Sequence, residues 1–246
     1  MIRAIGVVMI LGLLLSGSLL AQDANRILSR VDSVINAPKD QKATMKMILV
    51  DKQGNQKIRQ AEFMQKGSEK RLLRFTAPAD QKGIAFLSLP NDVQYLYMPA
   101  FHKVRRIASH VKNTKFAGTD FTYDDLSAFS YSRDFNARLL ETNDQFWVLE
   151  LTPKPGVEKD YGKLKMWVRR DNYYPVKVEF YDPAGNLWKI MERRQITRVG
   201  NYWVAREMEM QDLKEQHRTI IQLDDISFDL NLPDKYFTRR YLKRGK

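Results

Sequence analysis

Side chains that could carry acid–base or metal chemistry are sparse in this 246-residue sequence. The three histidines, His102, His110 and His217, are not spaced as a helical pair of metal ligands, and there is no cysteine. No Gly-x-Ser-x-Gly turn, Ser-x-x-Lys motif, phosphate-binding loop or dinucleotide-binding glycine pattern occurs. We therefore expect no enzymatic activity, no metal and no cofactor.

The remaining candidates for acid–base catalysis are three carboxylates, Asp120, Asp124 and Asp125, which follow a chain-breaking Gly118. We expect Asp120 to cap a short helix that contains the other two, because an aspartate ahead of a helical run accepts its first backbone N–H groups. We expect the other two carboxylates to form ion pairs with an arginine: Arg105, Arg106 or Arg133.

These carboxylates belong to an insert, residues 99–126, in a chain that otherwise reads as strands. The strand before the insert ends at Pro99, and a cationic cluster follows it: His102, Lys103, Arg105 and Arg106. A polar, partly helical excursion from a β-rich fold is a common place for function.

The rest of the chain predicts about a dozen antiparallel strands and one amphipathic helix. Apolar and polar residues alternate in short runs, such as 163–168, with turn signals between them. The predicted strands are 43–50, 57–66, 69–76, 84–89, 93–98, 133–141, 145–151, 163–170, 176–181, 187–198, 203–212 and 218–225. The helix covers 23–35, and its apolar stripe must pack on the sheet.

The first residues read as a secretory signal. Arg3 precedes the apolar run Ile5–Leu15, and the small residues at 16–18 lead to Ala21. A retained membrane anchor is the alternative, but the run is short for a span of about 20 residues. We expect cleavage after Ala21, export to the periplasm, and a single domain over 22–246.

The formal net charge of +12 points to anionic partners. Export excludes nucleic acid, which leaves an anionic membrane surface or an acidic protein. The alternative is that the basic surface only keeps the protein in solution. Both remain open.

A sheet of about a dozen strands must curl to avoid open edges, and so few short helices cannot fill its concave side. Either large side chains fill the interior or a lined cavity remains, and apolar faces alone favour a solid core. The residues that would line such a cavity are Met45, Met47, Leu49, Phe63, Leu73, Phe75, Phe86, Trp147, Leu149, Met166, Val178 and Phe180.

Four motifs carry a resemblance to a known family: L-Y-M-P-A-x-x-K-V-R-R-I, then F-x-G-T-D-F-T-Y-D-D-L, with R-F-T-A-P-A-D-Q-K-G-I-A-F-L before them and L-P-D-K-Y-F-T near the end. Together they resemble the LolA-like outer membrane lipoprotein-sorting protein family. Its members are periplasmic relatives of the lipoprotein carrier LolA and of the regulator RseB, and often accompany RND-type exporters.

The resemblance implies a mostly β fold with some α: a curved antiparallel sheet that forms an unclosed half-barrel, with short helices in its concave face. It implies a monomeric carrier of lipid or lipoprotein acyl chains that serves an RND-type exporter. The alternative is an RseB-like envelope-stress sensor that binds a membrane protein.

The resemblance also implies that the insert acts as a lid, tied to the sheet by an arginine. The candidates for that arginine are Arg59, Arg71, Arg74 and Arg138. The residues expected at the lid or the cavity mouth are Phe101, Lys103, Arg105, Arg106, Phe116, Gly118, Asp120, Phe121 and Tyr123. The cationic members of this set are a solvated loop, a contact for phosphate head groups, or a docking site for a transporter.

Overall fold

The computed structural model describes residues 23–127 and 130–244, so the predicted signal sequence (1–21) lies outside the described residues. Within them, thirteen strands form one antiparallel sheet. The strands are β1 Asp40–Val50, β2 Gln56–Lys66, β3 Lys70–Ala77, β4 Ala85–Leu89, β5 Val93–Met98, β6 Lys103–Arg106, β7 Phe135–Thr142, β8 Phe146–Pro153, β9 Lys163–Arg169, β10 Pro175–Tyr181, β11 Leu187–Val199, β12 Tyr202–Asp212 and β13 His217–Phe228.

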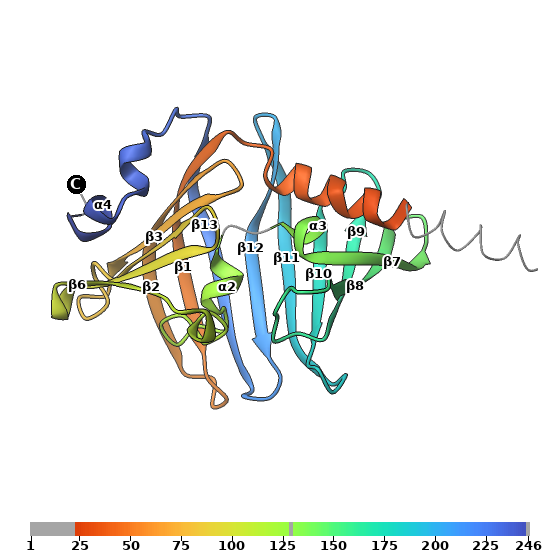
Figure 1. Cartoon of the computed structure of the whole chain (residues 1–246), viewed down its shortest axis with the longest axis horizontal. Helices are drawn as coiled ribbons and strands as arrows, with labels where there is room; N and C mark the ends of the chain where they lie inside the picture. The colour runs from red at the N-terminus through yellow and green to blue at the C-terminus, as the bar shows by residue number, and fades with distance from the viewer. Residues whose placement is uncertain (1–22, 128–129, 245–246) are drawn as a thin grey trace, which may run out of the picture.

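The sheet order is β6-β5-β4-β3-β2-β1-β13-β12-β11-β10-β9-β8-β7, so the first strand pairs with the last near the middle. β6 and β7 are the two edges and do not pair with each other. The sheet curves strongly without closing, as Figure 1 shows. This confirms the predicted unclosed half-barrel.

Buried side chains alternate with less buried ones along the strands. In β9, Leu164, Met166 and Val168 are buried, while the residues between them are half-buried. The same alternation holds in β1, where Met45, Met47 and Leu49 face the main core. A period of two places every second side chain on the concave face.

Short helices cover the concave face. The N-terminal helix, residues 23–35, buries Ala24, Leu28 and Val31 in the main core and lies across the sheet in front of β9 to β11 (Figure 1). The other elements on this side are the 3-10 helix η2 Ser109–Val111 and the one-turn helices α2 Tyr123–Leu126 and α3 Tyr131–Asp134, whereas the 3-10 helix η1 Pro99–Phe101 forms the turn between the edge strands β5 and β6. None of the described helices is both long and apolar enough to cross a membrane.

The C-terminal segment covers part of the opposite face. Phe237 and Leu242, from η3 Asp234–Phe237 and α4 Arg239–Arg244, pack with Leu72 and Leu87 of the sheet in a second apolar cluster. Nη2 of Arg74 donates to the backbone carbonyls of Tyr241 and Leu242 at 3.0 and 3.1 Å. The C-terminal segment is therefore held on the sheet by both apolar packing and hydrogen bonds.

Two predicted boundaries were wrong. The cationic run after η1 forms the edge strand β6, which pairs with β5 although its exposed side chains give no apolar alternation. The strand predicted from residue 133 begins at Phe135, because Ser130 caps the one-turn helix α3 ahead of it.

Candidate functional site

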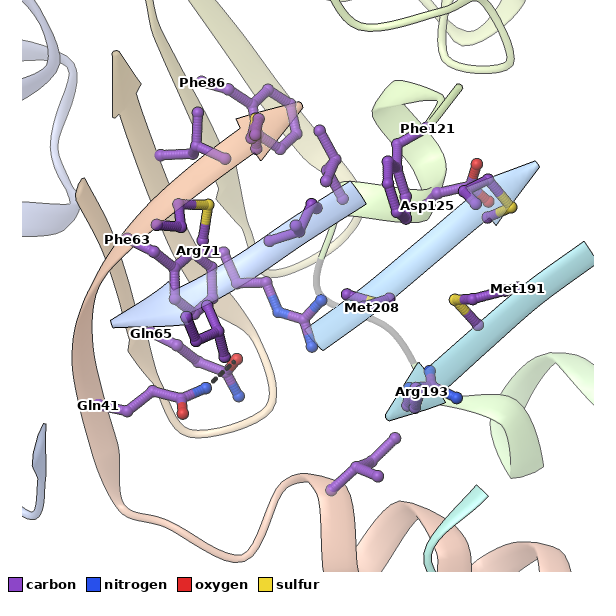
Figure 2. Close-up of a pocket in the computed structure, with 18 of the residues that line it drawn as sticks. Gln41, Phe63, Gln65, Arg71, Phe86, Phe121, Asp125, Met191, Arg193 and Met208 are labelled. Carbon is purple, nitrogen blue, oxygen red and sulfur yellow. Dashed lines mark hydrogen bonds between the residues drawn. The ribbon is translucent and has the colours of Figure 1, made fainter. Parts of the chain in front are cut away.

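A cavity of about 260 Å³ lies between the concave face and the short helices that cover it (Figure 2). Five of its lining residues are methionines, and phenylalanine, leucine and isoleucine supply most of the rest. The lining is Ile35, Gln41, Met45, Met47, Phe63, Gln65, Arg71, Leu73, Phe86, Phe121, Asp125, Leu126, Tyr131, Tyr174, Phe180, Met191, Arg193, Met208, Met210, Ile221, Leu223 and Ile226. Flexible methionines let such a wall adapt to the shape of an apolar guest.

A second hollow of about 130 Å³ continues from the first. The two share lining residues, among them Ile35, Arg193 and Met208, and the second reaches Trp203 and Phe228. The apolar space therefore extends beyond the first cavity along the sheet.

Residues 115–127, which we call the covering segment, close the cavity on the side away from the sheet. Three of them, Phe121, Asp125 and Leu126, line the cavity. Phe116 is fully buried and stacks on Phe75 of β3, with ring centroids 5.6 Å apart. Gly118 has a φ of +75°, which favours glycine and turns the chain back over the sheet.

Asp120 fixes the covering segment to the sheet. Its side chain is completely buried; Oδ2 accepts from Oγ1 of Thr219 at 2.7 Å and lies 2.6 Å from Nδ1 of His217, and Oδ1 accepts from Nζ of Lys115 at 3.1 Å. Its backbone carbonyl accepts from Nζ of Lys189 at 2.9 Å. One residue of the segment thus contacts side chains from both β11 and β13.

Lys115 extends this network toward the protein surface. Its Nζ lies 3.2 Å from Asp212 and 2.6 Å from Glu215. Burial lowers the pKa of Lys115, but the carboxylates of Glu215, Asp120 and Asp212 outweigh this effect and raise the pKa overall.

Within the described part of the chain, no three His, Asp or Glu side chains lie close enough to hold a metal ion.

Thr122, and not Asp120 as predicted, caps α2. The Thr122 hydroxyl accepts from the Asp125 N–H at 3.0 Å, and the Asp125 carboxylate accepts from the Thr122 N–H at 2.8 Å. The predicted arginine partners of the two following carboxylates were also wrong, because Asp124 pairs with Lys159 at 2.7 Å. Asp120 cannot act as the cap because the bonds to the sheet engage its side chain.

Comparison with known proteins identifies the family. A family model described as "-like: Uncharacterized protein" matches residues 67–244. A solved structure described as an outer membrane lipoprotein-sorting protein domain, from Vibrio parahaemolyticus, is 31% identical with a TM-score of 0.84, and the match covers 91% of this chain and 100% of that one. The chain belongs to the LolA-like outer membrane lipoprotein-sorting protein family.

Two further structures share the LolA-like fold. A DUF1329 family protein from Desulfovibrio piger is 23% identical with a TM-score of 0.85, over 91% of this chain and 99% of that one. A LolA superfamily protein from Nitrosomonas europaea is 23% identical with a TM-score of 0.74, over 89% of this chain and 98% of that one. No curated protein matches the chain.

Two sheet arginines tie the covering segment of this LolA-like chain to the sheet. Nη1 of Arg59 on β2 donates to the carbonyl of Ala117, and Nη1 of Arg71 on β3 donates to the carbonyl of Ser127 at 2.6 Å. Of the other candidates, Arg74 contacts the C-terminal helix and Arg138 pairs with Glu150. All four arginines lie in predicted strands, so the sequence alone does not show which of them contacts the covering segment. Their positions in the folded sheet decide this.

The structure brings about half of the predicted cavity residues to the cavity. Met45, Met47, Phe63, Leu73, Phe86 and Phe180 line it, together with Phe121 of the predicted lid. Leu49, Phe75, Leu149, Met166 and Val178 are buried in the surrounding core, and Trp147 is half-buried with its ring 5.0 Å from that of Tyr173. Phe116, Gly118, Asp120 and Tyr123 belong to the covering segment, where the rings of Phe116 and Tyr123 are 5.5 Å apart.

The cationic residues predicted at the cavity mouth lie elsewhere. Lys103, Arg105 and Arg106 are on β6, because this run continues the sheet outward instead of folding over it. None of the three lines the cavity, and Phe101 beside them is 62% exposed. The polar residues that do line it, including Arg193 and Tyr174, carry no local sequence signal for that role.

Asp125 is the one carboxylate in the cavity wall among the residues that the structure describes, and burial raises its pKa above the ordinary value. A carboxyl group whose pKa is raised on folding costs no stability at low pH and destabilises the fold as pH rises past the unfolded pKa. We therefore expect Asp125→Asn, which keeps an acceptor for the Thr122 N–H, to raise the thermal midpoint by a few degrees at neutral pH.

Melting curves over a range of pH check this expectation. The gap between Asp125→Asn and the parent protein should close as pH falls toward the ordinary aspartate pKa. A gap that stays constant with pH would show that the effect comes from packing and not from the carboxylate charge.

Proposed function

We propose that this chain is a periplasmic carrier that holds acyl chains of a lipid or lipoprotein in the cavity beneath the covering segment and passes them to or from an envelope transport system. The single observation that supports this most is the cavity itself: a hollow of about 260 Å³, walled by methionine and phenylalanine, inside a curved sheet. A solid core would have left no space for cargo.

The energetics of acyl chains favour a carrier. Each CH₂ group exposed to water costs about 0.8 kcal/mol, so a chain of about fourteen carbons costs on the order of 10 kcal/mol. A lipid does not cross an aqueous compartment at a useful rate against that cost. An apolar cavity offsets it, and a flexible methionine wall accepts chains of different shape.

Release of the cargo requires the covering segment to move. The cavity volume is near the lower end of the roughly 300–1,000 Å³ that ligand pockets span, so a long chain needs more room than the closed state offers. Phe121 and Leu126 project into this space, and displacing them enlarges it. Hydrogen bonds from Arg59 and Arg71 hold the segment through backbone carbonyls, contacts that water can replace when the segment opens.

Two measurements test the carrier role. We expect mass spectrometry of a denatured extract of the purified protein to find a bound amphiphile. We also expect a neutral fluorescent acyl probe to bind saturably, with one probe per chain. A protein that carries no amphiphile and takes up no probe would contradict the proposal.

The partner surface in this proposal is basic. A shallow hollow at the β6 edge is lined by His102, Lys103, Val104, Arg105, Arg239, Arg240 and Lys243, and the exposed Phe101 ring is next to it in sequence. Cations around an exposed aromatic ring suit an anionic membrane surface, where a transfer partner would sit. Flotation with anionic against neutral vesicles measures this, and equal flotation with both contradicts it.

A further inference from the structure

Two guanidinium groups share the cavity. Arg71 comes from β3 and Arg193 from β11, on opposite sides of the central strands; both line the cavity, and Figure 2 shows Arg71 reaching into it. Arg193 also lines the second hollow. Cations are unusual in a wall made mostly of apolar side chains, because burial of a charge without a partner costs several kcal/mol.

Backbone carbonyls satisfy these cations only in part. Arg71 donates through Nη1 to Ser127, and its Nε is enclosed with no hydrogen-bond partner. Arg193 donates through Nη1 to the Pro175 carbonyl at 3.2 Å. Within residues 23–127 and 130–244, neither arginine forms an ion pair with a carboxylate.

The electrostatics of the pair favour an anion. Burial, the larger effect, and the nearby positive charge of Arg193 together lower the pKa of Arg71 to about 10, so Arg71 stays protonated at neutral pH although the two guanidinium groups repel each other. Asp125 does not relieve this, because its carboxylate accepts from the Thr122 N–H and lies 3.4 Å from the Tyr161 hydroxyl.

Most of the polar side chains gather on one side of the cavity. Gln41, Gln65 and Arg193 lie toward the side nearest the N-terminal helix, whereas Phe86 and Phe121 lie on the far side, with Asp125 beside them (Figure 2). Gln41 and Gln65 are hydrogen-bonded to each other at 3.0 Å. An elongated guest with a polar head and an apolar tail matches this distribution.

We propose that Arg71 and Arg193 together bind the carboxylate head of a single-chain amphiphile, with the acyl chain running among the methionines and phenylalanines. Guanidinium groups present paired N–H donors that match the two oxygens of a carboxylate, and such charge-assisted bonds are the strong ones. The inference rests on the proposed function, because it needs the cavity to take an acyl chain. It adds the class of ligand and its orientation: the head group lies inside the cavity, between Arg71 of β3 and Arg193 of β11.

Calorimetric titration with dodecanoate and dodecanol at neutral pH tests the inference, because the two probes share a chain and differ in head-group charge. We expect dodecanoate to bind about 10–100-fold more tightly, the effect of hydrogen bonds to a charged group. Arg71→Met and Arg193→Met should each remove at least about tenfold of that preference, and Arg193→Met should change dodecanol affinity little. Arg71→Met also removes the hydrogen bond to Ser127 of the covering segment, so the readout for this variant is the ratio of the two affinities. Arg194→Met is the matched control, since Arg194 is the next residue on β11 and pairs with Glu192, Glu207 and Glu209 instead.

The outcomes separate the inference from the carrier role. Equal binding of the two probes to the parent protein, or an equal loss of both in the arginine variants, overturns the inference and leaves the carrier proposal standing. Binding of neither probe overturns the carrier proposal itself. Should a variant fail to fold, the comparison of the two probes on the parent protein still decides.

Discussion

Replacement of Asp120 with alanine is expected to lower the free energy of unfolding by about 3–5 kcal/mol, the usual cost of removing one partner from a buried ionic network. The substitution leaves Lys115 without its innermost carboxylate and leaves Thr219 and His217 without their acceptor. Because the Asp120 carboxylate joins the covering segment to Thr219 and His217 of β13, we also expect faster exchange of bound probe.

Chemical denaturation with urea measures the first effect, and the thermal midpoint should fall by about 2–4 °C for each kcal/mol lost in a domain of this size. Asp234→Ala is the matched control: Asp234 also pairs with two lysines, Lys66 and Lys70, but it is exposed and should have little effect. Equal losses in the two variants would show that the network around Asp120 is not special.

Met208→Trp is expected to reduce affinity for a neutral acyl probe by at least about tenfold while the protein still folds. Met208 lies on β12 and lines both hollows, so an indole at this position occupies space that the acyl chain needs. Overpacking of a wall typically costs about 1–3 kcal/mol, which a domain of this size tolerates.

Gln211→Trp provides the control for this second variant. Gln211 is three residues further along β12, so its side chain is on the opposite face of the sheet and outside the cavity lining. Probe titration measures the affinity of both variants, and circular dichroism shows whether each one folds. Undiminished probe binding by folded Met208→Trp would place the acyl chain somewhere other than this cavity.

The strands were the most predictable part of the structure. Runs such as Leu164, Met166 and Val168 alternate strictly because one face of the sheet is covered and the other is not, and this alternation is visible without coordinates. β6 escaped prediction because its side chains are mostly exposed cations, and an edge strand is held by backbone hydrogen bonds that leave no apolar pattern.

The site was less predictable, because it depends on which strands face one another. Met45 and Phe86 could be assigned to an apolar face, but the pattern does not distinguish a cavity wall from a packed core such as that around Leu149. Arg71 and Arg193 line the same cavity although their strands lie more than a hundred residues apart in sequence. Likewise, the residues next to Asp120 in the sequence predict a helix cap. Its role in holding the covering segment depends on Thr219 and His217, which are distant in the sequence.

The unpaired edges β6 and β7 have a mechanical consequence. In a closed barrel, strand number and shear fix the circumference. An open sheet carries no such constraint, so its bend can relax or tighten while every ladder between neighbouring strands stays intact. The wall opposite the covering segment can therefore change its curvature, and the proposed carrier would accept guests of different width by bending the sheet, without repacking its side chains.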